Sequence, residues 1–150
     1  MRVTGRTTIE APQAAVFEAI CDPAALLEVI PGCQGLERDG EDYHGRIALR
    51  LPAIVGTFDV HVRLVDAVTP SAGTLRGRLE GRIGTIDGSA TFRLNDDDGV
   101  TVIDYDGSAL VSGPLARLDS RLLEGLAGSL IAEGLSRLGR RLAAQAAVPA

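Results

Sequence analysis

The chain has 150 residues, of which 45% are hydrophobic and 23% charged, with a formal net charge of −5 at pH 7. Folding at this length buries roughly 68–70% of the surface of the unfolded chain, so we expect one domain over residues 1–146 and a tail at 147–150. The acidic balance and the scarcity of aromatic side chains argue against nucleic acid as a partner. No run approaches the ~18 apolar residues of a membrane span.

The N-terminal segment MRVTGRTTIE lacks the apolar run of a secretory signal, which predicts a cytoplasmic protein. Its two cysteines, Cys21 and Cys33, are then expected to stay reduced, and neither has a second cysteine pair or a nearby histidine at zinc-site spacing. All basic residues are arginine, so no lysine is available for a Schiff base or a P-loop. We therefore predict no metal and no cofactor.

Residues 3–10 alternate between apolar and polar side chains, which predicts a strand. Pro12 then suits the first position of a helix, and Asp22-Pro23 gives a clearer signal of this kind, a cap followed by proline, for a second short helix. Pro31-Gly32 ends that helix. The apolar faces of the two helices carry Val16, Phe17 and Ile20, and Leu26, Leu27 and Ile30, respectively.

From there to about residue 113 we expect about six antiparallel strands. Alternation is clear in 43–51, 57–65, 75–83, 86–94 and around 103–111. One face of each is apolar or small and the other is polar, which is typical of an antiparallel sheet with one wet face. The segment NDDDG at 95–99 is interpreted as a hairpin turn and not a calcium loop, because it lacks the distant glutamate.

After Ser112-Gly113-Pro114 the apolar period becomes helical and predicts one long amphipathic C-terminal helix. Its apolar stripe must pack against something, and the apolar face of the sheet is the only large surface available. The fold class is thus α+β. The stripe consists of Leu115, Leu118, Leu122, Leu126, Leu130, Leu135, Leu138 and Leu142.

The inward positions of the strands are unusually small. Glycine within a strand sacrifices packing volume, so these positions either allow bends and close approaches in a curved sheet or leave an internal apolar cavity for a ligand. We favour the cavity for the set as a whole. The small inward residues are Gly5, Gly45, Gly77, Gly81, Gly88, Ala90, Gly107 and Ala109, and glycines 125, 128, 134 and 139 interrupt the last helix.

The polar residues of the strands indicate binding and not catalysis. The charged side chains and both histidines, His44 and His61, fall on the outward face. The inward lining offers only the hydroxyls of Tyr43 and Tyr105 and the thiols. No general acid and base converge there, so we expect a protein that is not an enzyme.

Several stretches together resemble one family. They are Asp22-Pro23 with IPGC at 30–33, the run LEGRIGTIDGSA at 79–90, and the junction GSALVSGPLARLDSRLL at 107–123. They are similar to the family of the G subunit of carbon monoxide dehydrogenase, within the polyketide cyclase and START-like (SRPBCC) superfamily. Two positions depart from the family pattern, since Asp119 stands where glycine is usual and Gly134-Leu135 lacks an aromatic residue.

The resemblance implies a helix-grip fold, with a seven-stranded curved antiparallel sheet around the long helix and two short helices after the first strand. It also implies a hydrophobic pocket for a lipid or isoprenoid quinone, and association with a molybdenum hydroxylase or the inner face of the cell membrane. Leu26, Leu27, Ile30 and Cys33 would form the mouth. The full set expected to contact the ligand is Phe17, Leu26, Leu27, Ile30, Pro31, Cys33, Leu49, Phe58, Val60, Leu79, Ile83, Phe92, Tyr105, Leu122, Leu126 and Leu130.

Two other hypotheses stay open. The protein is a docking subunit that uses arginines 76, 78, 82 and 93 and those of the last helix to bind a redox enzyme, or it is a cyclase-type or hydrolase-type enzyme, for which an inward acid or base would be needed. Cys33 is interpreted as a small residue at the corner of the pocket, because no histidine or basic residue adjoins it in the sequence.

Overall fold

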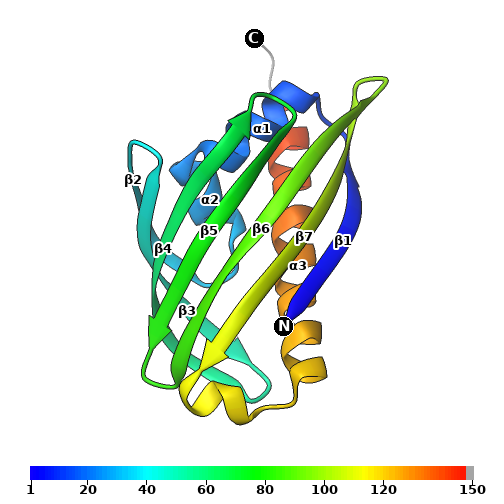
Figure 1. Cartoon of the computed structure of the whole chain (residues 1–150). Helices are drawn as coiled ribbons and strands as arrows, with labels where there is room; N and C mark the ends of the chain where they lie inside the picture. Colours follow the sequence, from blue (N-terminus) through cyan, green and yellow to red (C-terminus); the bar gives the residue numbers. More distant parts are fainter. Residues whose placement is uncertain (148–150) are drawn as a thin grey trace.

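The structure is a computed structural model that describes residues 1–147. Seven strands form one antiparallel sheet in the order β1-β7-β6-β5-β4-β3-β2, and the sheet curves around the long helix α3 (Figure 1). The predicted tail at 147–150 lies outside the described residues except for Ala147, with which α3 ends. The elements are β1 (Arg2–Ile9), α1 (Gln13–Cys21), α2 (Pro23–Val29), β2 (Cys33–Asp39), β3 (Asp42–Leu51), β4 (Ile54–Val68), β5 (Ala72–Gly81), β6 (Gly84–Asp97), β7 (Val100–Ser112), the 3-10 helix η1 (Gly113–Arg117) and α3 (Ser120–Ala147).

The two short helices begin and end close to the residues that the sequence marked. Asp22 caps α2 by accepting a hydrogen bond from the backbone N–H of Ala24 at 3.0 Å, and Pro23 is the first helical residue. Pro12 is the cap of α1 and not its first residue. Gly32 follows the second helix with φ of 81°, and a Cβ there would lie 2.1 Å from the carbonyl oxygen of Ala48, so only glycine fits this corner.

The period-two pattern assigned the faces of the strands correctly. Tyr43, Ile47 and Leu49 of β3 are buried and His44 and Arg46 are exposed, and β4 to β7 alternate in the same sense. The pattern did not single out β2, because CQGLERD does not alternate cleanly and its pairing with β3 shifts register between Cys33 and Gly35. The concave face of the sheet is therefore apolar and the convex face polar.

The core divides into two clusters. One joins α1, α2 and the last turns of α3 to the sheet, with Val16, Phe17 and Leu138 among its buried members. The other, which we call the lower cluster, lies at the opposite end of the sheet and fills the space where α3 begins. It consists of Ile47, Leu49, Ile54, Phe58, Leu115 and Leu123.

The start of the long helix differs from the prediction. Residues 113–117 form the separate 3-10 helix η1, and α3 begins only at Ser120. Asp119 sets that start, because its Oδ1 accepts hydrogen bonds from the backbone N–H groups of Arg121 at 2.8 Å and Leu122 at 3.4 Å. In α3, Leu123 is buried and Leu122 is 40% exposed. The expectation that Leu122 faces the sheet is wrong.

Candidate ligand cavity

An apolar cavity of about 350 Å³ lies between the concave face of the sheet and the helices α2 and α3. Its volume falls in the range of roughly 300–1,000 Å³ typical of small-molecule sites. No acid, base or amide side chain lines it, and the Tyr105 phenol is the one titratable group among its residues. The lining consists of Ile20, Leu26, Val29, Ile30, Pro31, Ile47, Leu75, Ala90, Phe92, Ile103, Tyr105, Leu130, Ile131, Gly134, Leu135 and Leu138.

A second cavity of about 310 Å³ continues the first one toward β1. The two share Leu75, Ala90 and Ile131 in their linings, so they are neighbouring compartments. The floor of the second compartment is made of small residues that face one another across the strands. They are Gly77 opposite Gly88, Gly88 opposite Ala109, and Ala90 opposite Gly107.

The inward glycines serve two purposes. At Gly5, Gly73 and Gly81 an aromatic ring lies across the strand, since a Cβ would come within 2.3 Å of the Tyr105 hydroxyl, 2.8 Å of the Phe92 ring and 2.8 Å of the Phe58 ring, respectively. These glycines allow close packing and leave no space. At Gly77 the nearest side-chain atom is 3.4 Å from such a Cβ, and this residue lines the second compartment. Both explanations for the glycines therefore hold, each for different positions.

The placement of α3 keeps this space open. Its closest backbone neighbours are β1, α2 and α1, whereas the central strands lie farther away. Glycines mark two of these approaches, since a Cβ at Gly128 would lie 3.9 Å from Val3 and one at Gly134 would lie 3.7 Å from the carbonyl oxygen of Val29. The helix thus lies against the edge strand β1 and the two short helices. The central strands β5 to β7 present mainly glycine and alanine to the space beneath it.

The predicted contact residues fall into three groups. Leu26, Ile30, Pro31, Phe92, Tyr105 and Leu130 line the first compartment, and Leu79 lines the second. Phe17, Leu49 and Phe58 are buried in the core clusters, and Val60, Ile83 and Leu126 pack against the lower cluster. Leu27 and Leu122 are exposed at 39% and 40%, and Cys33 lies outside the lining of both compartments.

Several lining residues are absent from the predicted set for identifiable reasons. Alternation places Ala90 and Ile103 on the inward face, but the prediction chose only the next inward residues of the same strands, Phe92 and Tyr105, as walls of the pocket. Ile131 and Gly134 lie beside the leucine stripe on the last helix, and the prediction included only leucines from that helix. Val29 was not placed on the apolar face of the second helix. The remaining members that were not predicted are Ile20, Ile47, Leu75, Leu135 and Leu138.

The two cysteines are free thiols in settings that disfavour the thiolate. Burial raises the pKa of the Cys33 thiol, which donates a weak hydrogen bond to the carbonyl oxygen of Gly35 at 3.7 Å. Burial likewise raises the pKa of the Cys21 thiol. A thiol with a raised pKa is a poor nucleophile at neutral pH, which agrees with a packing role for Cys33.

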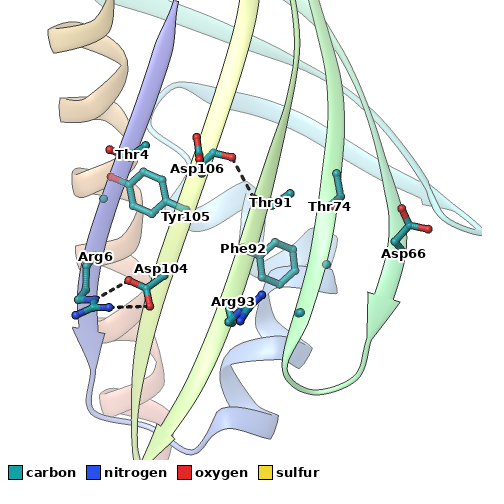
Figure 2. A pocket seen from close by; sticks show the side chains of 13 residues that line it. Thr4, Arg6, Asp66, Thr74, Thr91, Phe92, Arg93, Asp104, Tyr105 and Asp106 are labelled. Carbon is teal, nitrogen blue, oxygen red and sulfur yellow. Dashed lines mark hydrogen bonds and ion pairs between the residues drawn. The ribbon is translucent and has the colours of Figure 1, made fainter.

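A larger hollow of about 640 Å³ lies on the convex face of the sheet and has charged and hydroxyl side chains among its lining (Figure 2). Arg6 crosses it to pair with Asp104 at 2.6 Å, and the hydrogen bond from Arg6 holds the pKa of this carboxyl below its usual value. Thr91 donates to the carbonyl oxygen of Asp106 at 3.4 Å. The hollow is open to water, and Arg6 and Asp104 pair across it, so it is a shallow part of the wet face, unlike the apolar cavity on the concave side.

Residues 1–147 offer neither a membrane span nor a metal site of three or more protein ligands. No helix in this range is both long and apolar enough to cross a membrane. The same range contains no group of three or more histidine, cysteine, aspartate or glutamate residues placed to hold a metal ion. His44 and His61 stack across β3 and β4 with ring centroids 4.3 Å apart, on the exposed face of the sheet.

A curved sheet around a long C-terminal helix, with an apolar cavity between them, defines the helix-grip fold of the ligand-binding START-like (SRPBCC) class. Residues 5–143 match the model of the family of CoxG, the G subunit of carbon monoxide dehydrogenase, so the chain belongs to this family. No curated protein matches the chain.

Solved structures agree with this fold. A conserved protein from Geobacillus kaustophilus is similar with a TM-score of 0.91 and 26% sequence identity, over 95% of each chain. A START superfamily protein from Mycobacterium smegmatis gives a TM-score of 0.73 at 14% identity, over 96% of this chain and 98% of that one. A protein from Thermus thermophilus gives 0.71 at 18% identity, over 97% and 99%. The last two likenesses show the fold alone.

Proposed function

We propose that the protein is a non-enzymatic carrier of an apolar ligand, held in the cavity between α2, α3 and the sheet. The observation that carries this proposal is the lining of the first compartment, where every residue is aliphatic, aromatic or glycine. Such a surface gains free energy by removing an apolar ligand from water, at about 25 cal/mol for each Å² buried. It offers little to a polar or charged substrate.

The absence of catalytic groups from this lining supports a carrier more than an enzyme. General acid–base chemistry needs a titratable group within hydrogen-bonding reach of the substrate. Within the described residues, the charged side chains and histidines of the strands point to the convex face, and Tyr43 uses its hydroxyl for a 2.7 Å hydrogen bond to the carbonyl oxygen of Cys21. A ligand bound in this cavity would be released without chemical change.

The best candidates for the ligand are an isoprenoid quinone or another lipid. Two adjacent compartments suit an elongated molecule, with one part under α2 and another on the small-residue floor beside β1. The family name adds support, since a subunit of carbon monoxide dehydrogenase works next to an enzyme that releases electrons. A quinone carrier would link such an enzyme to an acceptor.

Native mass spectrometry with organic extraction tests this proposal. Protein purified from its own host without detergent should carry an extractable quinone or lipid, or should take one up from added quinone. Protein that stays unliganded after exposure to both classes would contradict the proposal.

A second candidate function is docking to a molybdenum hydroxylase, and it has its own observation. Arg76 and Arg93 lie exposed on the convex face and form neither an ion pair nor a side-chain hydrogen bond with any described residue. Arg78, in contrast, is engaged by Glu80 and Asp87. Co-purification with the hydroxylase at low salt, lost in an Arg76→Glu/Arg93→Glu variant, would support docking. Binding that is unchanged by the variant would count against this surface.

A further inference from the structure

The chain contains two histidines, and the fold brings them together. His44 on β3 and His61 on β4 are direct partners across the two strands, and their rings stack with centroids 4.3 Å apart and planes inclined by 24°. They are well separated in the sequence, so only the pairing of the strands makes them neighbours. This is why spacing along the chain predicted no metal site. We call these two residues the histidine pair.

The hydrogen bonds between β3 and β4 place the histidine pair where side chains approach closely. Leu64 donates its backbone N–H to the carbonyl oxygen of Glu41 at 3.0 Å, so these two residues form a hydrogen-bonded pair of the ladder. Bonded and non-bonded pairs alternate along antiparallel strands, and the histidine pair follows three pairs later, which makes it a non-bonded pair. The Cα atoms of such a pair are about 4.5 Å apart. Both imidazoles can therefore reach one ion without movement of the backbone.

The separation of the rings suits a shared metal ion. Two imidazole nitrogens bound to one zinc ion are about 3–3.5 Å apart, because each Zn–N bond is about 2.0–2.1 Å long. Rings whose centroids are 4.3 Å apart reach this arrangement by rotation about the side-chain torsions. Both side chains are exposed on the convex face, so no packing opposes this rotation.

Carboxylates lie beside both histidines. Oδ1 of Asp42 is 3.4 Å from Nε2 of His61. Glu37 is the partner of His44 on β2, is exposed, and forms no ion pair with any described residue. Negative charge next to the pair favours a cation bound there, and a carboxylate that bonds one ring nitrogen also orients the other toward a metal.

The arginines around the histidine pair are already engaged. Arg78, the neighbour of the pair on β5, pairs with Glu80 and with Asp87. Arginines 46 and 63 each pair with an aspartate, at 3.4 and 3.5 Å, respectively. Their charges are therefore compensated within the protein and oppose a cation only weakly. A hollow of about 350 Å³ that both histidines line gives an ion access from water.

We propose that the histidine pair binds a divalent ion of the late first-row transition metals, such as zinc. Imidazole suits zinc, copper and nickel, whereas magnesium and calcium prefer oxygen ligands. Among residues 1–147 no further histidine, cysteine or carboxylate is placed to complete the site, so water takes the remaining coordination positions. The pair lies on the face of the sheet opposite to the apolar cavity, so the failure of one proposal does not decide the other.

Calorimetric titration of the full chain, prepared without a histidine tag, tests the proposal. Zinc chloride should bind saturably at neutral pH with one ion per chain, and magnesium chloride should not bind. His44→Gln and His61→Gln should each weaken zinc binding by about 100-fold, because the second imidazole then no longer adds an intramolecular contact. The matched control is Cys21→Ser/Cys33→Ser, which removes both thiols of the chain and should bind zinc as the wild type does.

Nuclear magnetic resonance and thermal unfolding give independent readouts. Zinc should shift the ring signals of both histidines together, and it should raise the melting temperature of the wild type but not of His44→Gln. Binding should be lost at pH 5, where protons compete for the ring nitrogens. Wild-type protein without saturable zinc binding would overturn the proposal, as would unchanged affinity in either histidine variant. Loss of binding in the cysteine variant would assign zinc to the thiols and overturn it as well.

Discussion

Two glycines on the same strand should respond oppositely to alanine. In β5, Gly77 and Gly81 both point to the concave face, and replacing either by alanine reduces the entropy of the unfolded chain, which is worth about 0.4–1 kcal/mol. This contribution is common to both variants and cancels in their comparison. The remaining difference reports what each new methyl group meets in the folded protein.

The structure gives these surroundings directly. At Gly77 a Cβ would meet Val62 at 3.4 Å and the carbonyl oxygen of His61 at 3.8 Å, which is ordinary contact. At Gly81 it would meet both the Phe58 ring and the backbone oxygen of Thr57 at 2.8 Å, and Phe58 is fully buried. Overpacking of this kind costs about 1–3 kcal/mol. Gly77→Ala should therefore be slightly stabilised, and Gly81→Ala should be less stable than Gly77→Ala by about 1–3 kcal/mol.

Urea unfolding of the two variants measures this difference, provided that the dependence of the unfolding free energy on urea stays the same. Each kcal/mol should also lower the melting temperature by roughly 2–4 °C in a domain of this size. Equal stabilities would refute the assignment of Gly81 to ring packing. A strongly destabilised Gly77→Ala would show that the second compartment is filled and not open.

Three other variants test the remaining structural claims. Thr101→Val removes the hydroxyl that donates to the carbonyl oxygen of Ala11 at 2.7 Å in a fully buried site, and it should cost about 1–3 kcal/mol in urea unfolding; a cost near zero would contradict the bond. Arg6→Gln removes the group that lowers the pKa of Asp104, and a depressed carboxyl pKa stabilises the fold above the unfolded value of about 3.9 and ceases to do so as pH falls through the folded value. Arg6→Gln should therefore lower the melting temperature at pH 7 but not in strong acid, and a deficit that persists there would contradict this reasoning. Cys33→Ser should leave the uptake of an apolar fluorescent probe intact, because the side chain lies outside both compartments, and complete loss would show that the thiol is required.

Most of the fold could be predicted because its signals are local. Alternation assigned the faces of the strands, and Asp22-Pro23 and Pro31-Gly32 marked the ends of α2 through the capping hydrogen bond and the positive φ that these residues favour. The start of α3 could not be read in this way. Gly113-Pro114 is compatible with the start of any helical turn, and the sequence does not show that Leu115 bonds to Ile83 of the β5–β6 turn, which ties this turn to the sheet as the separate helix η1.

The cavity was less predictable than the fold. An inward position can be buried under a neighbour or open to a cavity, and the difference depends on tertiary contacts. Phe58 and Phe92 are both inward aromatic residues, yet Phe58 seals the lower cluster whereas Phe92 forms part of the cavity wall. Glycines in α3 likewise weaken the sequence signal for which side of the helix faces the sheet. The prediction therefore placed Leu122 inward where Leu123 is buried, although it placed Leu130 correctly in the cavity lining.

The most direct test of the cavity as the ligand site is a pair of phenylalanine substitutions on β6. Ala90→Phe places a ring in the region that both compartments share, and Thr91→Phe places the same ring on the exposed convex face one residue away. Titration with N-phenyl-naphthylamine, a fluorescent apolar probe, should show saturable binding to the wild type and to Thr91→Phe, and little binding to Ala90→Phe at unchanged melting temperature. Equal probe binding by a folded Ala90→Phe would contradict the cavity as the binding site.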